Sequence, residues 1–356
     1  MTSALVLAAP GVLRIEARPT REILPDEVSL AVIATGICGS DVHGAAGHTG
    51  RRQIGQVMGH ETVGRVQAVG SDVGPEWVGR IVAVDPVVSC GDCAACATGA
   101  QQHCDRGWVL GVRPDVDAGY ATDLVVPARN LVPLPLGMPA WHGAVVEPLA
   151  VGFHAAMRGA ARPGDRVVII GGGPIGQAVA LGCRRLGVTR ILVSEPDEAR
   201  GALIERLGFE RTRPDVIDTA IADVLGGEAT LVFDVVGIDA TIATALEKSA
   251  PLARVVLVGM DSPQLSVQAY RMSSGERTLI GTICSTRPHF EATMAWASEH
   301  GDIVELIVDR RAALDEGPAV FAELIAGTAS ANKILLMPTP ERGTEVGAEA
   351  VAWESA

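Results

Sequence analysis

Positive charge is scarce in this sequence. The 356 residues include 29 lysines and arginines against 42 aspartates and glutamates, which gives a formal net charge of −13. Only Lys248 and Lys333 are lysines. A protein that binds nucleic acid needs a basic surface, because the phosphate backbone is negative. The composition therefore argues against nucleic acid as a partner.

Long apolar segments and export signals are also missing. The longest apolar stretch, residues 167–183, is interrupted by five glycines, Pro174 and Gln177, so it fits a buried strand and turn better than a membrane span of about 20 residues. Met1–Val6 lacks the basic region of a secretory signal peptide. With 48% hydrophobic residues, the composition is typical of a globular protein. We expect a cytoplasmic protein without a membrane segment.

The chain length is typical of about two domains, and the sequence pattern changes near residue 165. Upstream, glycine and proline separate short apolar runs, as in an irregular β-barrel, and the predicted strands are residues 28–33, 62–69, 80–84 and 121–126. Downstream, strands are predicted at 166–170, 190–194, 231–236, 254–258 and 279–283, and helices at about 175–186, 198–207 and 238–249. This alternation predicts an α/β domain, a parallel sheet with helices on both faces.

The residues beyond about 288 are predicted to return to the first domain. Two short helices, near 290–300 and 319–325, and a strand at 333–337 are too small to form a core alone. We therefore expect a first domain of residues 1–150 and 288–338 and a second of residues 151–287. Residues 339–356, rich in Pro, Gly, Glu and Ala, are predicted to be a flexible tail.

Four of the seven cysteines gather between residues 90 and 104, in a loop rich in glycine and alanine. Four thiolates are the ligands of a closed, structural zinc site, and the predicted set, in a lobe of about residues 88–106, is Cys90, Cys93, Cys96 and Cys104. Two alternatives remain. Disulfides would be strained at this spacing, and an iron–sulfur cluster usually has a Cys-Pro ending that is absent here. His103 could replace Cys104. Metal-binding thiolates indicate a reducing compartment.

A second candidate metal site consists of residues that are far apart in the sequence. Cys38 lies upstream, His60 and Glu61 stand at the head of an apolar strand, and Glu147 lies near the end of the first half. Each residue alone is weak evidence, because single histidines more often have structural roles. A catalytic zinc needs about three such ligands and one exchangeable position.

A glycine-rich turn follows the strand predicted at 166–170. Its sequence, residues 171–176, is Gly-Gly-Gly-Pro-Ile-Gly, and an apolar helix comes next. Glycines there permit a tight turn and close approach of a pyrophosphate to the helix N-terminus. The residues predicted to bind a dinucleotide are Gly171, Gly173, Pro174, Ile175 and Gly176.

Glu195 ends the next predicted strand, at the position where an acidic side chain accepts hydrogen bonds from the adenosine ribose. Its charge would repel a 2'-phosphate, so NAD is favoured over NADP. Arg200, slightly further along, could instead pair with that phosphate, and its alternative role is that of a surface arginine.

The order of these motifs resembles that of the zinc-dependent medium-chain dehydrogenases of the alcohol dehydrogenase superfamily. The shared motifs are Cys-Gly-Ser-Asp-x-His at 38–43, Gly-His-Glu at 59–61, the four cysteines, Glu-Pro at 147–148 and the glycine-rich turn. Residues 147–152 are similar to the sorbitol and 2,3-butanediol dehydrogenase branch. The resemblance implies a GroES-like irregular β-barrel catalytic domain, a Rossmann domain with a doubly wound parallel sheet, and a homodimer or homotetramer.

The resemblance also implies a catalytic zinc and a proton relay. Cys38, His60 and a carboxylate would bind the ion, with Glu61 ranked first and Glu147 as a ligand or close neighbour. Ser40 would pass the substrate proton through the nicotinamide ribose toward His43. The structural alternatives are a serine that caps a turn and a histidine on the surface. With the cysteine lobe, two zinc ions per chain are expected.

The leading hypothesis is an enzyme that transfers hydride between NAD and a secondary alcohol, a polyol or vicinal diol, giving a ketone or aldehyde. A threonine or amino-alcohol dehydrogenase on the same scaffold and a non-catalytic dinucleotide-binding protein are the alternatives. The polar segment 48–58 departs from the family pattern, because it contains Arg51 and Arg52. We expect a solvated loop there. The alternative is contact with a hydroxylated or anionic substrate.

Overall fold

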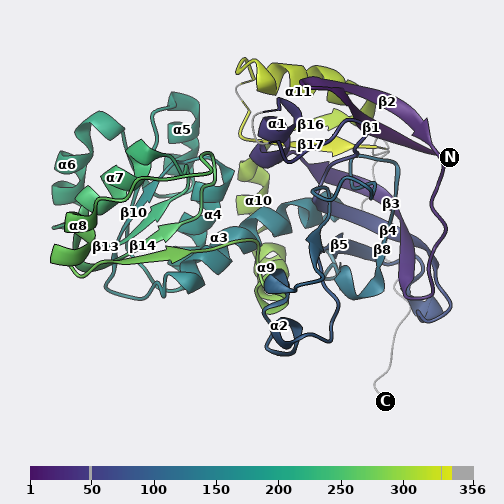
Figure 1. Cartoon of the computed structure of the whole chain (residues 1–356), viewed down its shortest axis with the longest axis horizontal. Coiled ribbons are helices and arrows are strands. Elements are labelled where there is room, and N and C mark those ends of the chain that lie inside the picture. The colour runs from purple at the N-terminus through teal and green to yellow at the C-terminus, as the bar shows by residue number, and fades with distance from the viewer. Residues whose placement is uncertain (48–49, 330, 339–356) are drawn as a thin grey trace.

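The computed structural model describes residues 1–47, 50–329 and 331–338. His48, Thr49 and the predicted tail 339–356 lie outside this part. Two α/β halves lie next to each other, with α3 (Val146–Arg158), α9 (Arg287–Glu299) and α10 (Gly301–Ile307) between them (Figure 1). Among the described residues, no helix combines the length and the apolar character that a membrane crossing requires.

The half that holds the glycine-rich turn contains a six-stranded parallel sheet. Its order is β12-β11-β10-β13-β14-β15, and the strands are Glu210–Thr212, Arg190–Ser194, Arg166–Ile170, Ala229–Asp234, Ser249–Leu257 and Thr278–Gly281. This is the doubly wound order 3-2-1-4-5-6, in which the first strand lies in the middle. The predicted Rossmann domain is confirmed.

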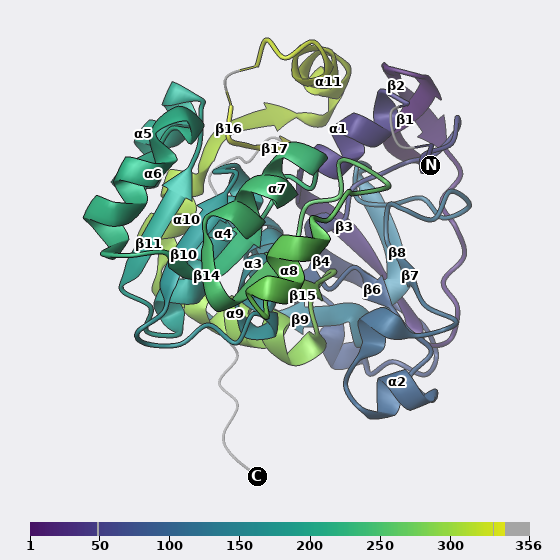
Figure 2. The same cartoon turned by 60° about the vertical axis from the view of Figure 1, so that its left-hand side comes forward.

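Both faces of this sheet are buried. In β10, Val167 and Ile169 belong to one hydrophobic cluster and Val168 and Ile170 to another, because successive side chains of a strand point to opposite faces. The covering helices are α4 (Pro174–Arg185), α5 (Glu198–Arg206), α6 (Ile217–Ala220), α7 (Asp239–Glu247) and α8 (Ala269–Ser274). Figure 2 turns this half toward the viewer, with α7 and α8 in front. The helices predicted at 175–186, 198–207 and 238–249 match α4, α5 and α7 within one or two residues.

The other half is built on a seven-stranded mixed sheet. Its order is β16-β17-β3-β4-β5-β9, with β8 also paired to β3, and the strands are Val308–Ala313, Lys333–Met337, Glu27–Gly36, Glu61–Val69, Ile81–Val84, Leu131–Pro133 and Asp123–Pro127. β17 pairs antiparallel with β3, where Leu335 faces Gly36. The predicted return of the C-terminal strand to the first half is therefore confirmed.

The N-terminal hairpin and helix α3 are among the elements of this half that were not predicted from the sequence. The hairpin of β1 (Thr2–Ala9) and β2 (Val12–Arg18) packs beside α11 (Gly317–Ile325) and α1 (Gly39–Ala45). Helix α3 escapes a pattern search because most of its residues are buried, so it has no regular polar face. Pro148 is tolerated because it lies in the first turn. Through α3, one hydrophobic cluster runs from Ala34 and Val63 to Val167 and joins the two halves.

Candidate active site

The end of β3 and the start of β4 bring three candidate ligands together. Gly36 of β3 is the register partner of Glu61 of β4, so Cys38, two residues past Gly36, lies beside His60 and Glu61. One ligand atom from each of Cys38, His60 and Glu61 lies within 4.8 Å of the others. A sulfur, an imidazole and a carboxylate at this separation fit a zinc ion with one open position.

The Glu61 carboxylate is buried at this strand end. Its exposed fraction is 1%, and a Cβ on Gly36 would overlap Glu61 Oε2, so any side chain there would force the carboxylate to move. Lys333 Nζ donates to both carboxylate oxygens at 2.8 Å and to the Ile37 carbonyl at 3.0 Å. Burial alone would lower the pKa of Lys333, but Glu61, Cys38 and Glu147 together outweigh it and raise that pKa above its ordinary value.

Lys333 was not predicted as a site residue. It comes from β17, 272 residues from Glu61 in sequence, and no local motif surrounds it. The one available signal was composition, since a chain that uses arginine almost everywhere keeps lysine at this position. A lysine concentrates its charge in one ammonium with three donors, which is what the three acceptors here require.

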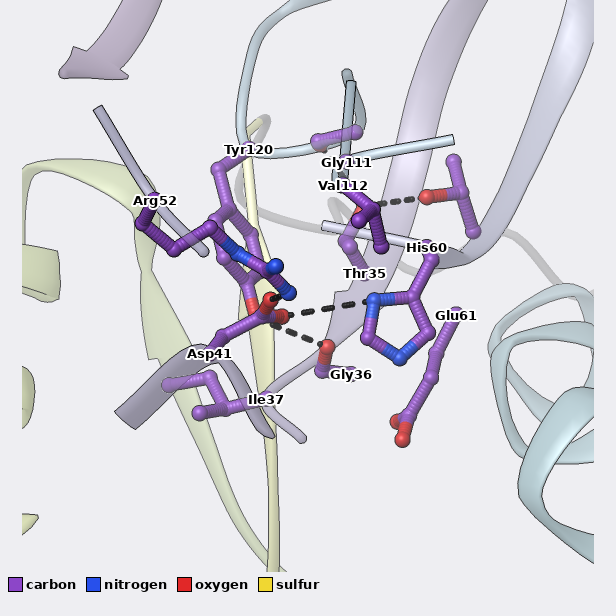
Figure 3. Close-up of polar contacts among 12 residues, drawn as sticks. Thr35, Gly36, Ile37, Asp41, Arg52, His60, Glu61, Gly111, Val112 and Tyr120 are labelled. Atoms are coloured by element: carbon purple, nitrogen blue, oxygen red, sulfur yellow. Dashed lines mark hydrogen bonds and ion pairs between the residues drawn. The ribbon is translucent and has the colours of Figure 1, made fainter. Parts of the chain in front are cut away.

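A buried carboxylate, Asp41, lies next to His60 (Figure 3). Asp41 is fully buried, and its Oδ2 lies 3.5 Å from His60 Nδ1 and accepts the Tyr120 hydroxyl at 2.8 Å. The other ring nitrogen of His60 is turned toward Glu61. Burial lowers the pKa of His60, but Asp41 and then Cys38 outweigh it and hold that pKa well above its ordinary value. At this distance Nδ1 makes no hydrogen bond to Asp41, so the contact between the two groups is electrostatic.

The four-cysteine lobe brings its sulfur atoms close together. The Sγ separations are 3.4 Å for Cys104 and Cys90, 3.5 Å for Cys93 and Cys96, and 3.9 Å for Cys90 and Cys96. A tetrahedral zinc with bonds of about 2.3 Å places its sulfurs about 3.8 Å apart. All four thiols are free. The donor set fits zinc, and His103, which is exposed, is not part of it.

The glycine-rich turn joins β10 to the N-terminus of α4. Gly176 approaches the turn so closely that a Cβ there would overlap the Gly171 carbonyl oxygen. A Cβ on Gly173, which caps α4, would meet no protein atom within 4 Å. The protein's own packing thus leaves space at a helix N-terminus, where an anion is stabilised. Pro174 and Ile175, both half-buried, form the first turn of the helix.

Glu195 directly follows β11, next to this turn. Its Oε2 accepts the Gly172 N–H at 2.8 Å and its Oε1 accepts the Asp197 N–H at 2.9 Å. Each carboxylate oxygen keeps a further lone pair for a ribose hydroxyl. Arg200 is exposed on α5, whose cap is the Asp197 side chain.

Comparisons with known proteins agree with this architecture. Residues 24–136 match the alcohol dehydrogenase GroES-like domain, and residues 174–299 match the zinc-binding dehydrogenase domain. The 2-dehydro-3-deoxy-L-galactonate 5-dehydrogenase of Pseudoalteromonas atlantica is 34% identical over 277 residues, which are 77% of this chain and 79% of that protein. This chain belongs to the zinc-type alcohol dehydrogenase family.

Two further relatives of the present chain act, according to their names, on idonate and sorbitol. The L-idonate 5-dehydrogenase of Vitis vinifera is 32% identical and the sorbitol dehydrogenase of Arabidopsis thaliana is 30% identical, each over 72% of this chain and 73% of the relative. The resemblance to the sorbitol dehydrogenase branch is confirmed, and the protein is an oxidoreductase.

Solved structures share the whole fold of this dehydrogenase. An Escherichia coli CFT073 protein described as a short chain alcohol dehydrogenase, solved with NADH, has a TM-score of 0.86 and 27% identity over 94% of this chain and 99% of its own. A zinc-binding dehydrogenase from Sinorhizobium meliloti, solved with NADP, has a TM-score of 0.85 and 27% identity over 95% of this chain and 99% of its own. The predicted pairing of a GroES-like barrel with a Rossmann domain is confirmed.

Glu147, Ser40 and His43 are the predicted catalytic residues outside the set of three candidate ligands. Glu147, in the first turn of α3, is 8% exposed and is not part of the set formed by Cys38, His60 and Glu61. Burial raises its pKa to about 7, with His60 opposing and Glu61 adding to the rise. Ser40 and His43 lie on α1, directly after Cys38, and both are exposed.

The expectation of a solvated loop was wrong for Arg52. Its side chain is 3% exposed, and its guanidinium donates to Asp41 Oδ1 at 2.9 Å. The charged Asp41 behind His60 attracts the arginine into the interior, and a buried charge needs such a partner. Arg51, by contrast, is exposed. Arg52 therefore neutralises the buried carboxylate next to His60 and is not positioned as a substrate contact.

Proposed function

We propose that this protein oxidises a secondary alcohol of a polyol, vicinal diol or sugar acid with NAD and zinc. The observation that carries the proposal is the set formed by Cys38, His60 and Glu61, with ligand atoms within 4.8 Å, in a chain that also has a dinucleotide-binding turn. The substrate class follows the names of the relatives, which act on idonate, sorbitol and a deoxygalactonate.

In this proposal Cys38, His60 and Glu61 bind the catalytic zinc and Glu147 lies beside it. When bound, the ion acts as a Lewis acid that lowers the pKa of the alcohol. Ser40 accepts the alcohol proton and releases its own toward the nicotinamide ribose, because a hydroxyl can both accept and donate. The exposed His43, three residues along α1, takes it on, since imidazole titrates near neutrality.

The four-cysteine lobe holds a second zinc in this proposal, supported by the sulfur separations of 3.4 to 3.9 Å. Because all seven cysteines are free and such thiolates persist under reducing conditions, the proposed compartment is the cytoplasm. The proposed domains are residues 1–150 with 288–338, and residues 151–287.

The proposed function is tested by following NADH absorbance with zinc-loaded protein and a panel of sugar acids, sugar alcohols, vicinal diols, amino alcohols and simple secondary alcohols. Turnover of a polyhydroxylated substrate is expected. If threonine is the preferred substrate, the protein is an amino-alcohol dehydrogenase. Zinc-loaded protein that binds NAD and turns over no substrate would support a non-catalytic dinucleotide-binding protein.

Glu195 is predicted to set the preference for NAD. The Glu195→Ser variant should lower the ratio of kcat/KM for NAD to that for NADP by about 10-fold or more, because a hydrogen bond to a charged group contributes about 1.5–3 kcal/mol. Steady-state kinetics with both cofactors measure this. The control is Glu198→Gln, a nearby carboxylate that instead pairs with Arg211 and Arg213, and it should leave the ratio unchanged. Wild-type protein that prefers NADP would contradict the assignment.

A homo-oligomer assembled through β15 is also part of the proposal. β15 ends the six-stranded sheet, so one of its edges pairs with no described strand. Leu252, Leu279 and Ile283, on or next to β14 and β15, are 69%, 36% and 44% exposed. An open edge with apolar side chains favours pairing between chains. Light scattering should report the mass of two or four chains, and a single-chain mass would exclude this assembly.

A further inference from the structure

Hydrogen bonds, together with the peptide bond between Asn332 and Lys333, connect the glycine-rich turn to Glu61. The Gly172 carbonyl accepts from Gln177 Nε2 at 2.8 Å. Gln177 also exchanges two hydrogen bonds with the side chain of Asn332, from Nε2 to Oδ1 at 2.8 Å and from Asn332 Nδ2 to Oε1 at 3.1 Å. The next residue, Lys333, donates to both oxygens of Glu61.

The orientation of both amides is fixed by their partners. Gln177 Nε2 uses its two hydrogens on the turn carbonyl and on Asn332, and Asn332 Nδ2 uses its two on Gln177 and on the Ile307 carbonyl at 2.9 Å. Turning either amide would set two acceptors or two donors face to face. Asp309 accepts the backbone N–H groups of both Asn332 and Lys333, at 2.6 and 3.0 Å. Asn332 and Lys333 are thus held as one unit.

This connection crosses from one half of the molecule to the other. Gln177 is 1% exposed and belongs to α4, which lies on the side of its half that faces the other (Figure 1). Asn332, 155 residues further along the chain, directly precedes β17 of the other half. A buried polar network in which every member is satisfied behaves cooperatively. A shift of the Gly172 peptide is therefore expected to change the position of Lys333 and of the Glu61 carboxylate, and the reverse.

We propose that Gln177 and Asn332 are positioning residues that couple dinucleotide binding to metal binding at Glu61. The inference rests on the proposed function, which assigns those two ligands. A dinucleotide bound at the turn contacts and positions the Gly172 peptide. A metal ion bound to Glu61 positions the carboxylate to which Lys333 donates its hydrogen bonds. The amide pair connects the two ends. Such coupling is reciprocal, so the factor by which metal tightens NADH binding equals the factor by which NADH tightens metal binding.

The experiment is a double-mutant cycle read by NADH fluorescence. The dissociation constant of NADH is measured for the zinc-loaded wild type and for Cys38→Ser, which lacks a ligand, and the coupling factor is their ratio. We expect a factor of about 5 or more, the lower end for allosteric coupling. In the Gln177→Met background, which keeps the side-chain length and removes the amide, the same ratio should fall to about 1. Asn332→Leu, at a half-buried position, is the second variant, with the same expected result.

The control is Thr293→Val. It removes another hydrogen bond of α4, the one from Arg185 at 3.2 Å, and should keep the wild-type factor. If the amide pair only held the two halves together, Gln177→Met would weaken NADH binding equally in both backgrounds, and the unchanged factor would overturn the inference. A wild-type factor of 1 would overturn it while leaving the proposed function intact. Wild-type protein that binds no NADH, or holds no more zinc than Cys38→Ser, would remove the proposed function as well.

Discussion

The Cys38→Ser variant is expected to lose at least about 10³-fold in kcat/KM, because a Lewis acid contributes several kcal/mol to the barrier and each 1.36 kcal/mol is tenfold. Cys38 is the one sulfur in the set with His60 and Glu61, and a hydroxyl oxygen is a harder, poorer ligand for zinc than a thiolate. The variant should hold one zinc ion fewer per chain. Metal analysis and steady-state kinetics on the same preparation measure both.

The matched control for this prediction is Cys183→Ala. Cys183 is fully buried in α4 and belongs to neither group of candidate ligands among the described residues. This control should keep the wild-type zinc content and kcat/KM. Cys38→Ser must also still bind NADH, which shows that its Rossmann half is folded. Full activity of Cys38→Ser, or an unchanged zinc content, would rule out Cys38 as a ligand.

The dinucleotide half could be predicted closely because each of its elements has a local signature. β10 and the glycine-rich turn are adjacent in sequence, and the helix that follows begins at Pro174, a residue whose fixed φ suits a first helical turn. The alternation of strands and helices then determines a parallel sheet. The strand predicted at 279–283 ends earlier, at Gly281, because only Thr278–Gly281 pairs with β14.

The surroundings of the site could not be predicted in the same way, because they depend on long-range pairing. Lys333 reaches Glu61 only because β17 pairs with β3. Arg52 is buried only because Asp41 and Tyr120 form a polar network beneath His60. In sequence, both basic residues have the pattern of solvent-exposed side chains. Charge compensation in the interior is a property of the folded arrangement, and no spacing rule encodes it.

The cysteine lobe has almost no core of its own, so a metal bound to its four thiols should determine its local stability. Its helical segments, Ala94–Ala97 and Gln101–His103, contain no buried residue. In small zinc domains the bound ion supplies folding free energy outright, about 10–16 kcal/mol. Cys93→Ser should therefore lose one zinc ion per chain and open the lobe, and it should leave the separate set of Cys38, His60 and Glu61 intact.

Trypsin measures this opening, because Arg106 is an exposed basic residue at the end of the lobe. Cleavage there depends on the population of the open form, so a loss of about 3 kcal/mol or more of local stability raises the cleavage rate at least about 100-fold. His103→Gln is the control, since His103 lies next to Cys104 but outside the sulfur cluster, and its zinc content and cleavage rate should equal those of the wild type. If His103→Gln loses the ion and Cys104→Ser keeps it, the fourth ligand is the imidazole. If Cys93→Ser keeps both its zinc and its resistance to trypsin, the lobe is held by its own packing, and the four thiols are not a structural metal site.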